Sequence, residues 1–562
     1  MLTKFSKFNG CTKIIKSDHN ILFLKVKCSW STSLKTERVE IFNLRNKECQ
    51  KQFFEDTNST SILSNSLENR QVVGGGKIWL KNLNTIIHRN FKKIRITAKH
   101  KEDKIQKLIT NRRNENESLN DDEISELISV RNRKVILEQV SGTADLSGNL
   151  SRLKMWKLKQ KICPKIENSV PVAKLDERGN LVSNTTEMKQ LYVRVYKHRL
   201  RHRDIQPELT QLRDLKEQLF SMRKKVAFNR KSEKWNFNDL MKVLKSLKVK
   251  KASDPVGLVN ELFKPGVAGD DLIHSILALC NMMKEECQLP AFLELANITS
   301  IFKNKGSKLD LNNDRGIFSV TCLRAILDKL MYNDFYDTID KNLSDSNVGG
   351  RKNRNIRDNL FIVYGIINNA IQNNLEVDLN FYDVAKCFDA QWHAETMNDM
   401  WNVGVNNDKF SLMSKLNEKC NIGIKTPAGM TERFSLEEIE MQGTVTGPIK
   451  ATVQIDSLGR DCYVRREGMY TYNDCVSVPP LSMCDDVASF SLCGVESVMT
   501  NAIINAMIES KKLEFGPSKC YNLHIGKNKH FCQELKVHNN VMNKKQVETY
   551  LGDVVSNDAT ND

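Results

Sequence analysis

The chain has 562 residues and a mass of 64.4 kDa, which is room for about two to four domains. Lys and Arg outnumber Asp and Glu by 85 to 68, a formal charge of +17 at pH 7, and this excess favours polyanionic partners such as nucleic acid. No apolar stretch approaches the roughly 18 residues that a membrane-spanning helix needs, so we expect no membrane partner.

The amino-terminal part of the chain is short of chemical signals. Residues 1–30 are strand-like, and residues 31–235 are predicted to form a basic, mostly helical linker region. Within it, the block RLKMWKLKQK at 152–161 suits either a solvent-exposed helix face or an RNA-contacting helix. Just after residue 235, an apolar stripe of Leu240, Leu244 and Leu247 follows a possible helix cap at Asn236 or Asn238, and this pattern predicts another helix.

From residue 250 onward, short apolar strands alternate with helices and glycine-containing turns, which is typical of an α/β or α+β domain. The fifteen cysteines occur singly, and no pair has the C-x-x-C spacing of a zinc site or redox motif. We therefore expect buried free thiols, as at Cys280, Cys322 and Cys420, in a reducing intracellular compartment.

Three aspartates stand out because each adjoins an apolar run. Asp383 follows the apolar and aromatic segment Leu379-Asn-Phe-Tyr, which predicts a strand. Asp485 and Asp486 lie side by side between two apolar arms within 480–490. The second pattern is typical of a β-hairpin with an acidic tip.

Adjacent like charges in an apolar run are costly unless a cation compensates them. A divalent metal supplies that charge, and nucleotidyl transfer uses two such ions roughly 4 Å apart. Mg²⁺ prefers oxygen ligands and binds through one or two carboxylates plus substrate phosphates. One carboxylate from a strand and two from a hairpin would meet that need. The Asp-Asp dipeptides at 121–122 and 270–271 lack apolar brackets and are predicted to be exposed turns.

The segment FYDVAKCFD at 381–389 resembles the first catalytic motif of reverse transcriptases from non-LTR (LINE-like) retrotransposons. The segment MCDD at 483–486 resembles their aromatic-Ala-Asp-Asp box, from which it departs by two apolar replacements. The resemblance implies that Asp383, Asp485 and Asp486 bind two Mg²⁺ ions, for which Mn²⁺ can substitute. It also implies that Phe388 excludes nucleotides with a ribose 2′-hydroxyl.

Other segments extend the resemblance from about Trp156 to Gly552, most of the chain. MQGTVTGP at 441–448 resembles the motif in which Gln442 and Gly443 lie under the incoming nucleotide. NNDRGI at 312–317 is similar to the fingers motif, and Arg315 would contact the triphosphate.

Two later segments continue the series. LEFGPSK at 513–519 resembles the motif whose lysine, here Lys519, protonates pyrophosphate as a general acid. Tyr550-Leu551-Gly552 is similar to the turn called the primer grip.

The segment Ser17-Asp-His-Asn20 resembles the last motif of AP-endonuclease-like nucleases, in which Asp18 and His19 would be the acid–base pair. An incidental tripeptide is the alternative. The upstream catalytic strands of such a nuclease are missing from the sequence, so we expect a carboxy-terminal remnant of that domain without nuclease activity.

The resemblance implies an α+β fold: a right-hand polymerase with fingers, palm and an incomplete thumb, preceded by the basic helical region. The remnant would occupy 1–30, the linker 31–235, the fingers 236–370, the palm 371–530, and the start of the thumb with the primer grip 531–562. The palm is expected to be an antiparallel sheet backed by helices.

The implied activity is RNA-directed DNA synthesis, with an RNA template, a DNA primer or target and dNTPs as partners, in nucleus and cytoplasm. Three alternatives stay open. The chain could be an inactive relic or an RNA-binding protein on a reverse transcriptase scaffold, because a full thumb is expected beyond Asp562. It could also be an RNA-dependent RNA polymerase, against which Phe388 argues, or a group II intron maturase, against which the segment at 17–20 argues.

Overall fold

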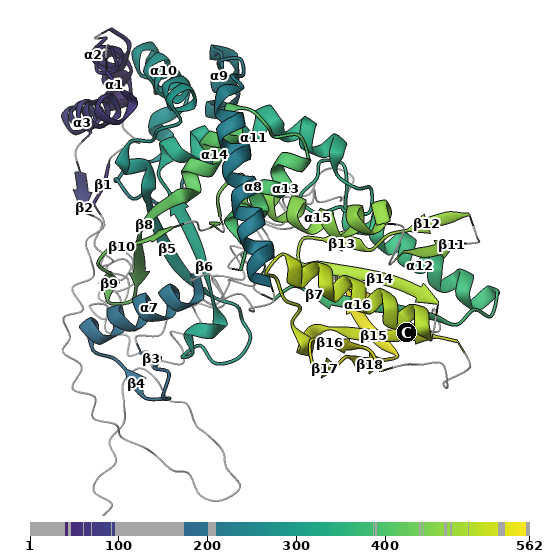
Figure 1. Cartoon of the computed structure of the whole chain (residues 1–562). Helices are drawn as coiled ribbons and strands as arrows, with labels where there is room; N and C mark the ends of the chain where they lie inside the picture. Colours follow the sequence, from purple (N-terminus) through teal and green to yellow (C-terminus); the bar gives the residue numbers. More distant parts are fainter. Residues whose placement is uncertain are drawn as a thin grey trace, which may run out of the picture.

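The computed structural model describes residues 40–42, 47–59, 61–68, 70–91, 93–95, 173–200, 209–385, 387, 390–437, 440–441, 443–465, 469–472, 475–492, 494–526 and 534–557. Asp18, His19, the block 152–161, Phe388 and Gln442 lie outside the described residues. The fold is mixed α and β, with helices around several sheets (Figure 1).

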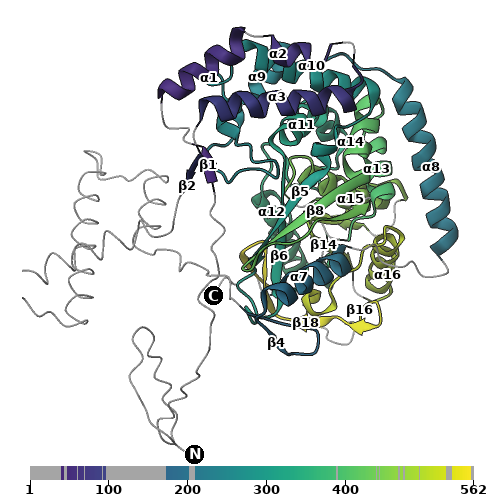
Figure 2. The ribbon, with the colours of Figure 1, turned by 90° about the vertical axis from the view of Figure 1, so that its left-hand side faces the viewer.

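Three early helices pack onto a later one. They are α1 (Lys47–Ser59), α2 (Ile62–Asn65) and α3 (Val72–Asn90), and they lie against α10 (Asp270–Glu286), as Figure 2 shows. The Trp79 indole N–H donates to Ser275 Oγ at 2.8 Å, and both helices contribute to one large apolar cluster. Part of the region predicted as a linker is therefore packed against the rest of the protein.

The prediction that Asp270 and Asp271 form an exposed turn was wrong. Both residues begin α10, and Asp271 is buried. Its carboxylate accepts hydrogen bonds from the backbone N–H groups of Leu63 (3.0 Å) and Ser64 (3.1 Å). The first N–H groups of a helix lack partners within it, and here α10 supplies the acceptor for α2.

A mixed sheet has the strand order β10-β8-β5-β6, with β9 paired to β8. Its strands are β5 (Leu295–Phe302), β6 (Asp314–Val320), β8 (Lys419–Thr426), β9 (Gly429–Met430) and β10 (Phe434–Glu437). Helix α7 (Thr185–Leu200) packs on this sheet through an apolar cluster that includes Tyr192, Tyr196, Ile298 and Phe318. Strands from both sides of the expected boundary at 370 thus share one sheet.

A second sheet has the order β13-β14-β7-β15-β18, and its neighbours are antiparallel except for β15 and β18. Its strands are β7 (Val377–Asp383), β13 (Leu481–Met483), β14 (Asp486–Leu492), β15 (Tyr521–Ile525) and β18 (Asn543–Lys545).

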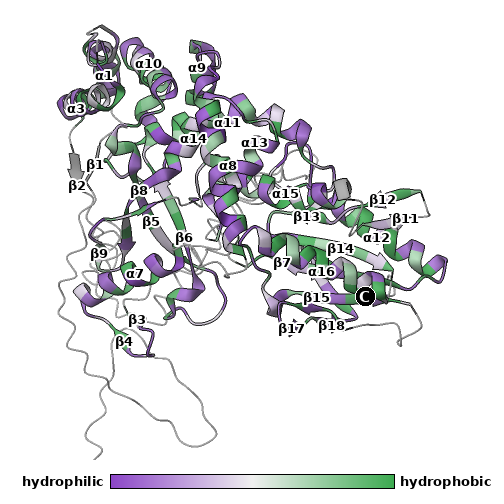
Figure 3. Cartoon of the chain, in the orientation of Figure 1, coloured by the Kyte–Doolittle hydropathy of each residue, from purple (hydrophilic) through white to green (hydrophobic). Residues whose placement is uncertain are grey.

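Helices cover both faces of the second sheet. α12 (Ile356–Gln372) shares one apolar cluster with Phe381, whereas α15 (Gly447–Arg465) and α16 (Val495–Ser510) share another with Tyr382. Successive side chains of a strand point to opposite faces, so β7 is buried on both sides. Figure 3 accordingly shows much of β14 and α12 as hydrophobic. The strand predicted before Asp383 and the hairpin predicted within 480–490 are both confirmed.

The remaining described α-helices pack mainly against one another and against α10 and α15. They are α8 (Thr210–Asn229), α9 (Phe237–Ser246), α11 (Cys322–Asn342), α13 (His393–Asn402) and α14 (Asp408–Glu418). The helix predicted behind Asn236 is confirmed as α9, and Asn236 forms a capping box with Asp239. Leu240 and Leu244 are buried on its inner face.

Short two-stranded ladders complete the described structure. They are formed by β1 (Glu40–Phe42) with β2 (Lys93–Arg95), β3 (Lys174–Leu175) with β4 (Leu181–Val182), β11 (Tyr470–Tyr472) with β12 (Val476–Val478), β16 (Lys536–Val537) with β17 (Asn540–Val541), and β19 (Val547–Tyr550) with β20 (Asp553–Ser556).

Cys280, Cys322 and Cys420 are buried free thiols, as expected. No helix within the described ranges combines the length and apolar character required to cross a bilayer.

The contact between α1 and α10 depends on a glycine. A Cβ added at Gly269 would lie 2.5 Å from the backbone of Phe54, Thr57 and Asn58. We expect Gly269→Ala to lower the free energy of unfolding by about 1–3 kcal/mol through overpacking. Gly74→Ala on α3 is the matched control. The added Cβ has no neighbour within 4 Å, and the substitution should raise the free energy of unfolding by roughly 0.5–1 kcal/mol. Urea unfolding of the three proteins measures both effects, and equal midpoints for all three would contradict the predicted close packing.

Candidate active site

The acidic hairpin places its carboxylates beside the aspartate that ends β7. β13 and β14 are joined by the two-residue turn Cys484-Asp485, and Met483 pairs with Asp486. Across the sheet Asp486 is the register partner of Asp383, and the Val384 N–H donates to the Asp485 carbonyl at 2.9 Å. The structure thus brings all three predicted aspartates to one end of two neighbouring strands.

The turn is strained at Cys484, where φ is 57°, a value that residues with a Cβ adopt rarely. The loop between α11 and α12 supports it. The Ser482 N–H donates to the Ser346 carbonyl at 2.9 Å, and the Val348 N–H donates to the Ser482 carbonyl at 3.1 Å. A Cβ at Gly349 would lie 2.8 Å from the Cys484 nitrogen, so this loop fits against the tip only without a side chain there.

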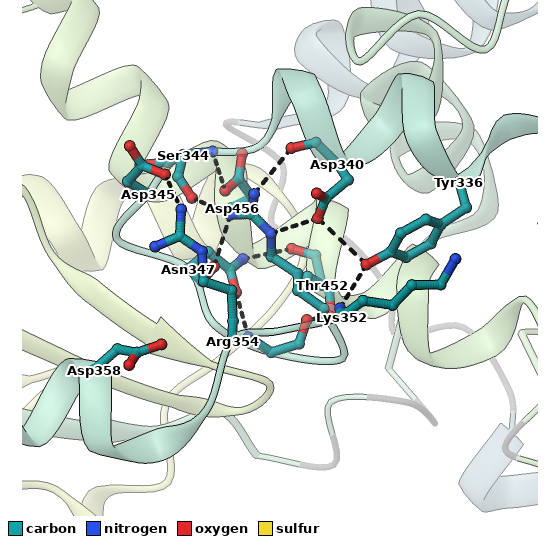
Figure 4. A network of polar contacts seen from close by, with 12 residues as sticks. Tyr336, Asp340, Ser344, Asp345, Asn347, Lys352, Arg354, Asp358, Thr452 and Asp456 are labelled. Atoms are coloured by element: carbon teal, nitrogen blue, oxygen red, sulfur yellow. Dashed lines mark hydrogen bonds and ion pairs between the residues drawn. The ribbon is translucent and has the colours of Figure 1, made fainter.

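A partly buried polar network anchors the supporting loop (Figure 4). The Asn347 amide donates to the Thr452 carbonyl at 3.0 Å, and Arg351 forms an ion pair with Asp340 at 2.8 Å. Sequence reasoning missed this loop. The glycine pair Gly349-Gly350 was the signal that could have found it, because such a pair often marks a close backbone approach.

Lys519 lies directly on Asp383. It ends a 3₁₀ turn, Pro517–Lys519, and its Nζ is 2.6 and 2.7 Å from the two carboxylate oxygens of Asp383. The Gly516 N–H also donates to the Asp383 carbonyl at 2.8 Å. The predicted general acid is therefore the counter-ion of a predicted metal ligand.

The three carboxylates together remain short of positive charge. Burial, followed by the charges of Asp485 and Asp383, raises the pKa of Asp486 to about 6, although Lys519 opposes the shift. Burial also raises the pKa of Asp485, an effect that Asp383 adds to and that Lys519 and Arg315 counter. A cluster that resists ionisation in this way would gain from a divalent cation.

The described residues do not form a complete metal cage. Among them, no group of three His, Cys, Asp or Glu side chains lies close enough together to hold an ion unaided. Mg²⁺ does not require such a cage, because one or two carboxylates plus substrate phosphates and water complete its coordination. The undercompensated charge on Asp485 and Asp486 therefore fits a cation that arrives with a nucleotide.

Arg315 lies on β6 of the other sheet, where it is exposed and close enough to lower the pKa of Asp485. Gly443, with φ of 115°, lies against the same strand. A Cβ there would be 2.7 Å from the Phe318 carbonyl oxygen. The glycine predicted to lie under a nucleotide thus allows the 440–447 loop to approach the strand that carries Arg315.

Two buried carboxylates anchor that loop. Glu440 accepts from His393 Nδ1 (3.1 Å), Asn417 Nδ2 (2.8 Å) and Lys450 Nζ (3.0 Å). At its other end Asp328 accepts from the backbone N–H of Val445 at 2.8 Å and from the Thr446 hydroxyl at 2.7 Å. Sequence reasoning gave neither residue a role, because their partners are far away along the chain.

A cavity of about 300 Å³ opens beside the carboxylates. Its lining includes Asp383, Asp486 and Lys519 together with Tyr550 and Leu551. The Tyr550 ring packs on Phe381 of β7 with centroids 4.7 Å apart, which attaches the β19–β20 hairpin to the central sheet.

The turn of that hairpin is Leu551-Gly552, with φ values of 51° and 86°. Positive φ at both positions is the geometry that two-residue hairpins favour. The predicted primer-grip turn therefore lies beside the predicted catalytic aspartates, whereas Phe388 and Gln442 fall outside the described residues.

Comparisons with known proteins do not assign this chain to a family. No family model matches the chain, and no curated protein matches it. Among the solved structures that match, an apo telomerase from Candida tropicalis truncated from its C-terminal domain aligns with 47% of this chain at 9% sequence identity and a TM-score of 0.34. The alignment covers 53% of the telomerase chain, about half its length. A likeness this distant carries no argument about function.

The loop anchor makes a prediction about acid stability. Burial favours a raised pKa for Glu440, but the Lys450 charge and the His393 hydrogen bond outweigh it and lower that pKa to about 2. A lowered folded-state pKa adds stability at pH values above the ordinary Glu range, and this stability is lost as the pH falls towards about 2. Glu440→Gln should destabilise by about 3–5 kcal/mol at pH 7, because Lys450 loses its partner, and should flatten the acid dependence.

Urea unfolding at a series of pH values measures both quantities. Glu418→Gln is the matched control, since its ion pairs are half exposed and should contribute no more than about 1 kcal/mol. If the free energy of unfolding changed with pH in the same way in Glu440→Gln and in the parent protein, the anchoring role would be ruled out.

Proposed function

We propose that this protein is an RNA-directed DNA polymerase of the non-LTR retrotransposon type, with a right-hand fold. The observation that carries the proposal is the register of β7 and β14, which sets Asp383 opposite Asp486 with Asp485 on the adjoining turn. Carboxylates converging from two strands beside an open cavity suit metal-assisted nucleotidyl transfer. The motifs that resemble those of this family supply the rest of the assignment.

In this proposal Asp383, Asp485 and Asp486, together with the substrate phosphates, would hold two Mg²⁺ ions. When bound, such ions lower the pKa of the attacking 3′-hydroxyl and neutralise the triphosphate. Lys519 would exchange its contact with Asp383 for one with the nucleotide, and would then be placed to donate a proton to the pyrophosphate leaving group. Its exposed side chain supports this role, because it can move without disturbing the core.

The nucleotide and primer would lie on either side of the carboxylates. Arg315 binds the triphosphate, a role that its fork of donors suits. Gly443 and Gln442 lie under the nucleotide, and Phe388 excludes a 2′-hydroxyl. The cavity beside Tyr550, Leu551 and Gly552 receives the primer end. RNA template and DNA primer or target are the proposed partners, in keeping with the net charge of +17.

Primer extension tests the proposal. Asp485→Ala should abolish incorporation of dTTP on poly(rA)/oligo(dT), with a loss of at least about 1000-fold, because a metal ligand is removed. Asp270→Ala is the matched control: it alters another Asp-Asp dipeptide, on α10, and should leave the rate unchanged. An intact parent protein that binds RNA but incorporates no dTTP would instead favour the RNA-binding alternative.

Sugar selection distinguishes a DNA polymerase from an RNA polymerase. Phe388→Ala should raise the ratio of ribonucleotide to deoxynucleotide incorporation by on the order of 100-fold, because the barrier to the 2′-hydroxyl is removed. The measurement is kcat/KM for dTTP and UTP in each protein. A parent protein that already prefers UTP would exclude reverse transcription and favour RNA-directed RNA synthesis.

A further inference from the structure

The strand that carries Arg315 is held from behind by a segment that sequence analysis assigned to the linker. Along β6 the buried and exposed positions alternate: Asp314 and Gly316 are buried, whereas Arg315 is exposed. Successive side chains of a strand point to opposite faces. Asp314 therefore points away from the face that presents Arg315.

Asp314 forms a buried ion pair with Lys174 of β3. Their Nζ–Oδ2 distance is 2.9 Å, and the side chains are only 1% and 2% exposed. Ser300 Oγ donates to the same oxygen at 2.7 Å and accepts from the Tyr196 hydroxyl of α7 at 2.9 Å. A lysine so deeply buried is stable only when its charge and donors are satisfied, so this arrangement is specific.

The same segment holds the backbone on either side of Asp314. Arg199 of α7 donates to the carbonyls of Leu311 (2.8 Å) and Asp314 (3.0 Å). Lys174 also donates to the Lys308 carbonyl at 2.8 Å. Lys174 and Arg199 together thus contact the Asp314 carboxylate and three backbone carbonyls between residues 308 and 314.

Helix α7 packs closely against β6. A Cβ at Gly316 would lie 2.5 Å from the Tyr196 ring, so the helix touches the β6 backbone directly behind Arg315. Tyr192 and Tyr196 also belong to the apolar cluster that covers this sheet. The segment 173–200 is therefore an integral layer behind β6.

We propose that Lys174 and Asp314 are positioning residues for the nucleotide site: their buried ion pair sets the register and direction from which Arg315 meets a triphosphate. The inference rests on the proposed function for its substrate, a deoxynucleoside triphosphate. It adds that residues 173–200 belong to the nucleotide site, not to a linker. Neither Lys174 nor Asp314 touches the nucleotide; they act through Arg315.

Kinetics of the full chain test the pair. Lys174→Met and Asp314→Asn should each raise the KM for dTTP on the order of tenfold, with kcat lowered less than about threefold, because orientation of the triphosphate contact is lost. In an Arg315→Ala background the same substitutions should change KM less than about twofold, since coupled residues are not additive. Arg194→Gln on α7 is the control: it breaks a solvent-exposed pair with Glu177, which lies in the turn between β3 and β4, and should match the parent.

An equal rise in KM with and without Arg315 would overturn the inference, because a general structural defect does not act through one side chain. An unchanged KM in both single variants would overturn it as well.

Because one unpaired buried charge can prevent folding, the double variant Lys174→Met/Asp314→Asn removes both charges together. It should fold, show the same rise in KM, and exchange the amide hydrogens of residues 315–319 faster than the parent. Exchange in β7 should be unchanged. If the parent protein extends no primer, the proposed function fails, but hydrogen exchange still tests whether the ion pair positions β6. Unaltered protection of residues 315–319 in the double variant overturns the inference. A loss of protection confined to β6 supports the positioning role of the pair.

Discussion

The backbone pairing of β7 with β14 brings mutually repelling carboxylates together, and the rest of the candidate site depends on that register. Hydrogen bonding along the ladder and apolar packing on both faces of the sheet maintain it. A slip of one residue would turn Tyr382 and Phe381 to the wrong faces and would separate Asp486 from Asp383. The cost of placing the charges side by side appears in the raised pKa of Asp486. Burial of the two apolar clusters is the favourable term that offsets it.

Loops around the site are anchored by buried charged groups. Glu440 and Asp328 anchor the loop that contains Gly443, and the Arg351 side chain anchors the loop behind Cys484. Backbone groups in buried loops need hydrogen-bond partners, and charged side chains make the stronger bonds. Each anchor also adds directionality that apolar packing lacks. Rigid loops suit a site whose two halves, on separate sheets, must keep a common distance to one substrate.

Lys519 compensates part of the negative charge of the site. Its ammonium group compensates Asp383, whereas Asp485 and Asp486 depend on weaker, more distant charges. The described side chains therefore compensate the negative charge of the three carboxylates only in part. Under the proposed function, that combination would favour cations which arrive together with a triphosphate.

Local pattern was enough to predict the elements that carry the site. The strand before Asp383, the hairpin that bears Asp485 and the helix capped by Asn236 depend on residues next to one another in the chain, and periodicity and capping rules recognise such groups. Resemblance in motif supplied the candidate roles. It also predicted that Asp383, Asp485 and Asp486 meet, but it did not give the strand register that places Asp486 opposite Asp383.

Only the tertiary structure decided the contacts between distant residues. It set Asp486 opposite Asp383, placed Lys519 on the same carboxylate, made Asp271 a helix cap, and buried Lys174 behind Arg315. The residues next to a lysine or aspartate in the sequence do not show whether its side chain is buried or exposed. Its environment depends on chain segments packed against it from far away, and that packing leaves no periodic signal in the sequence.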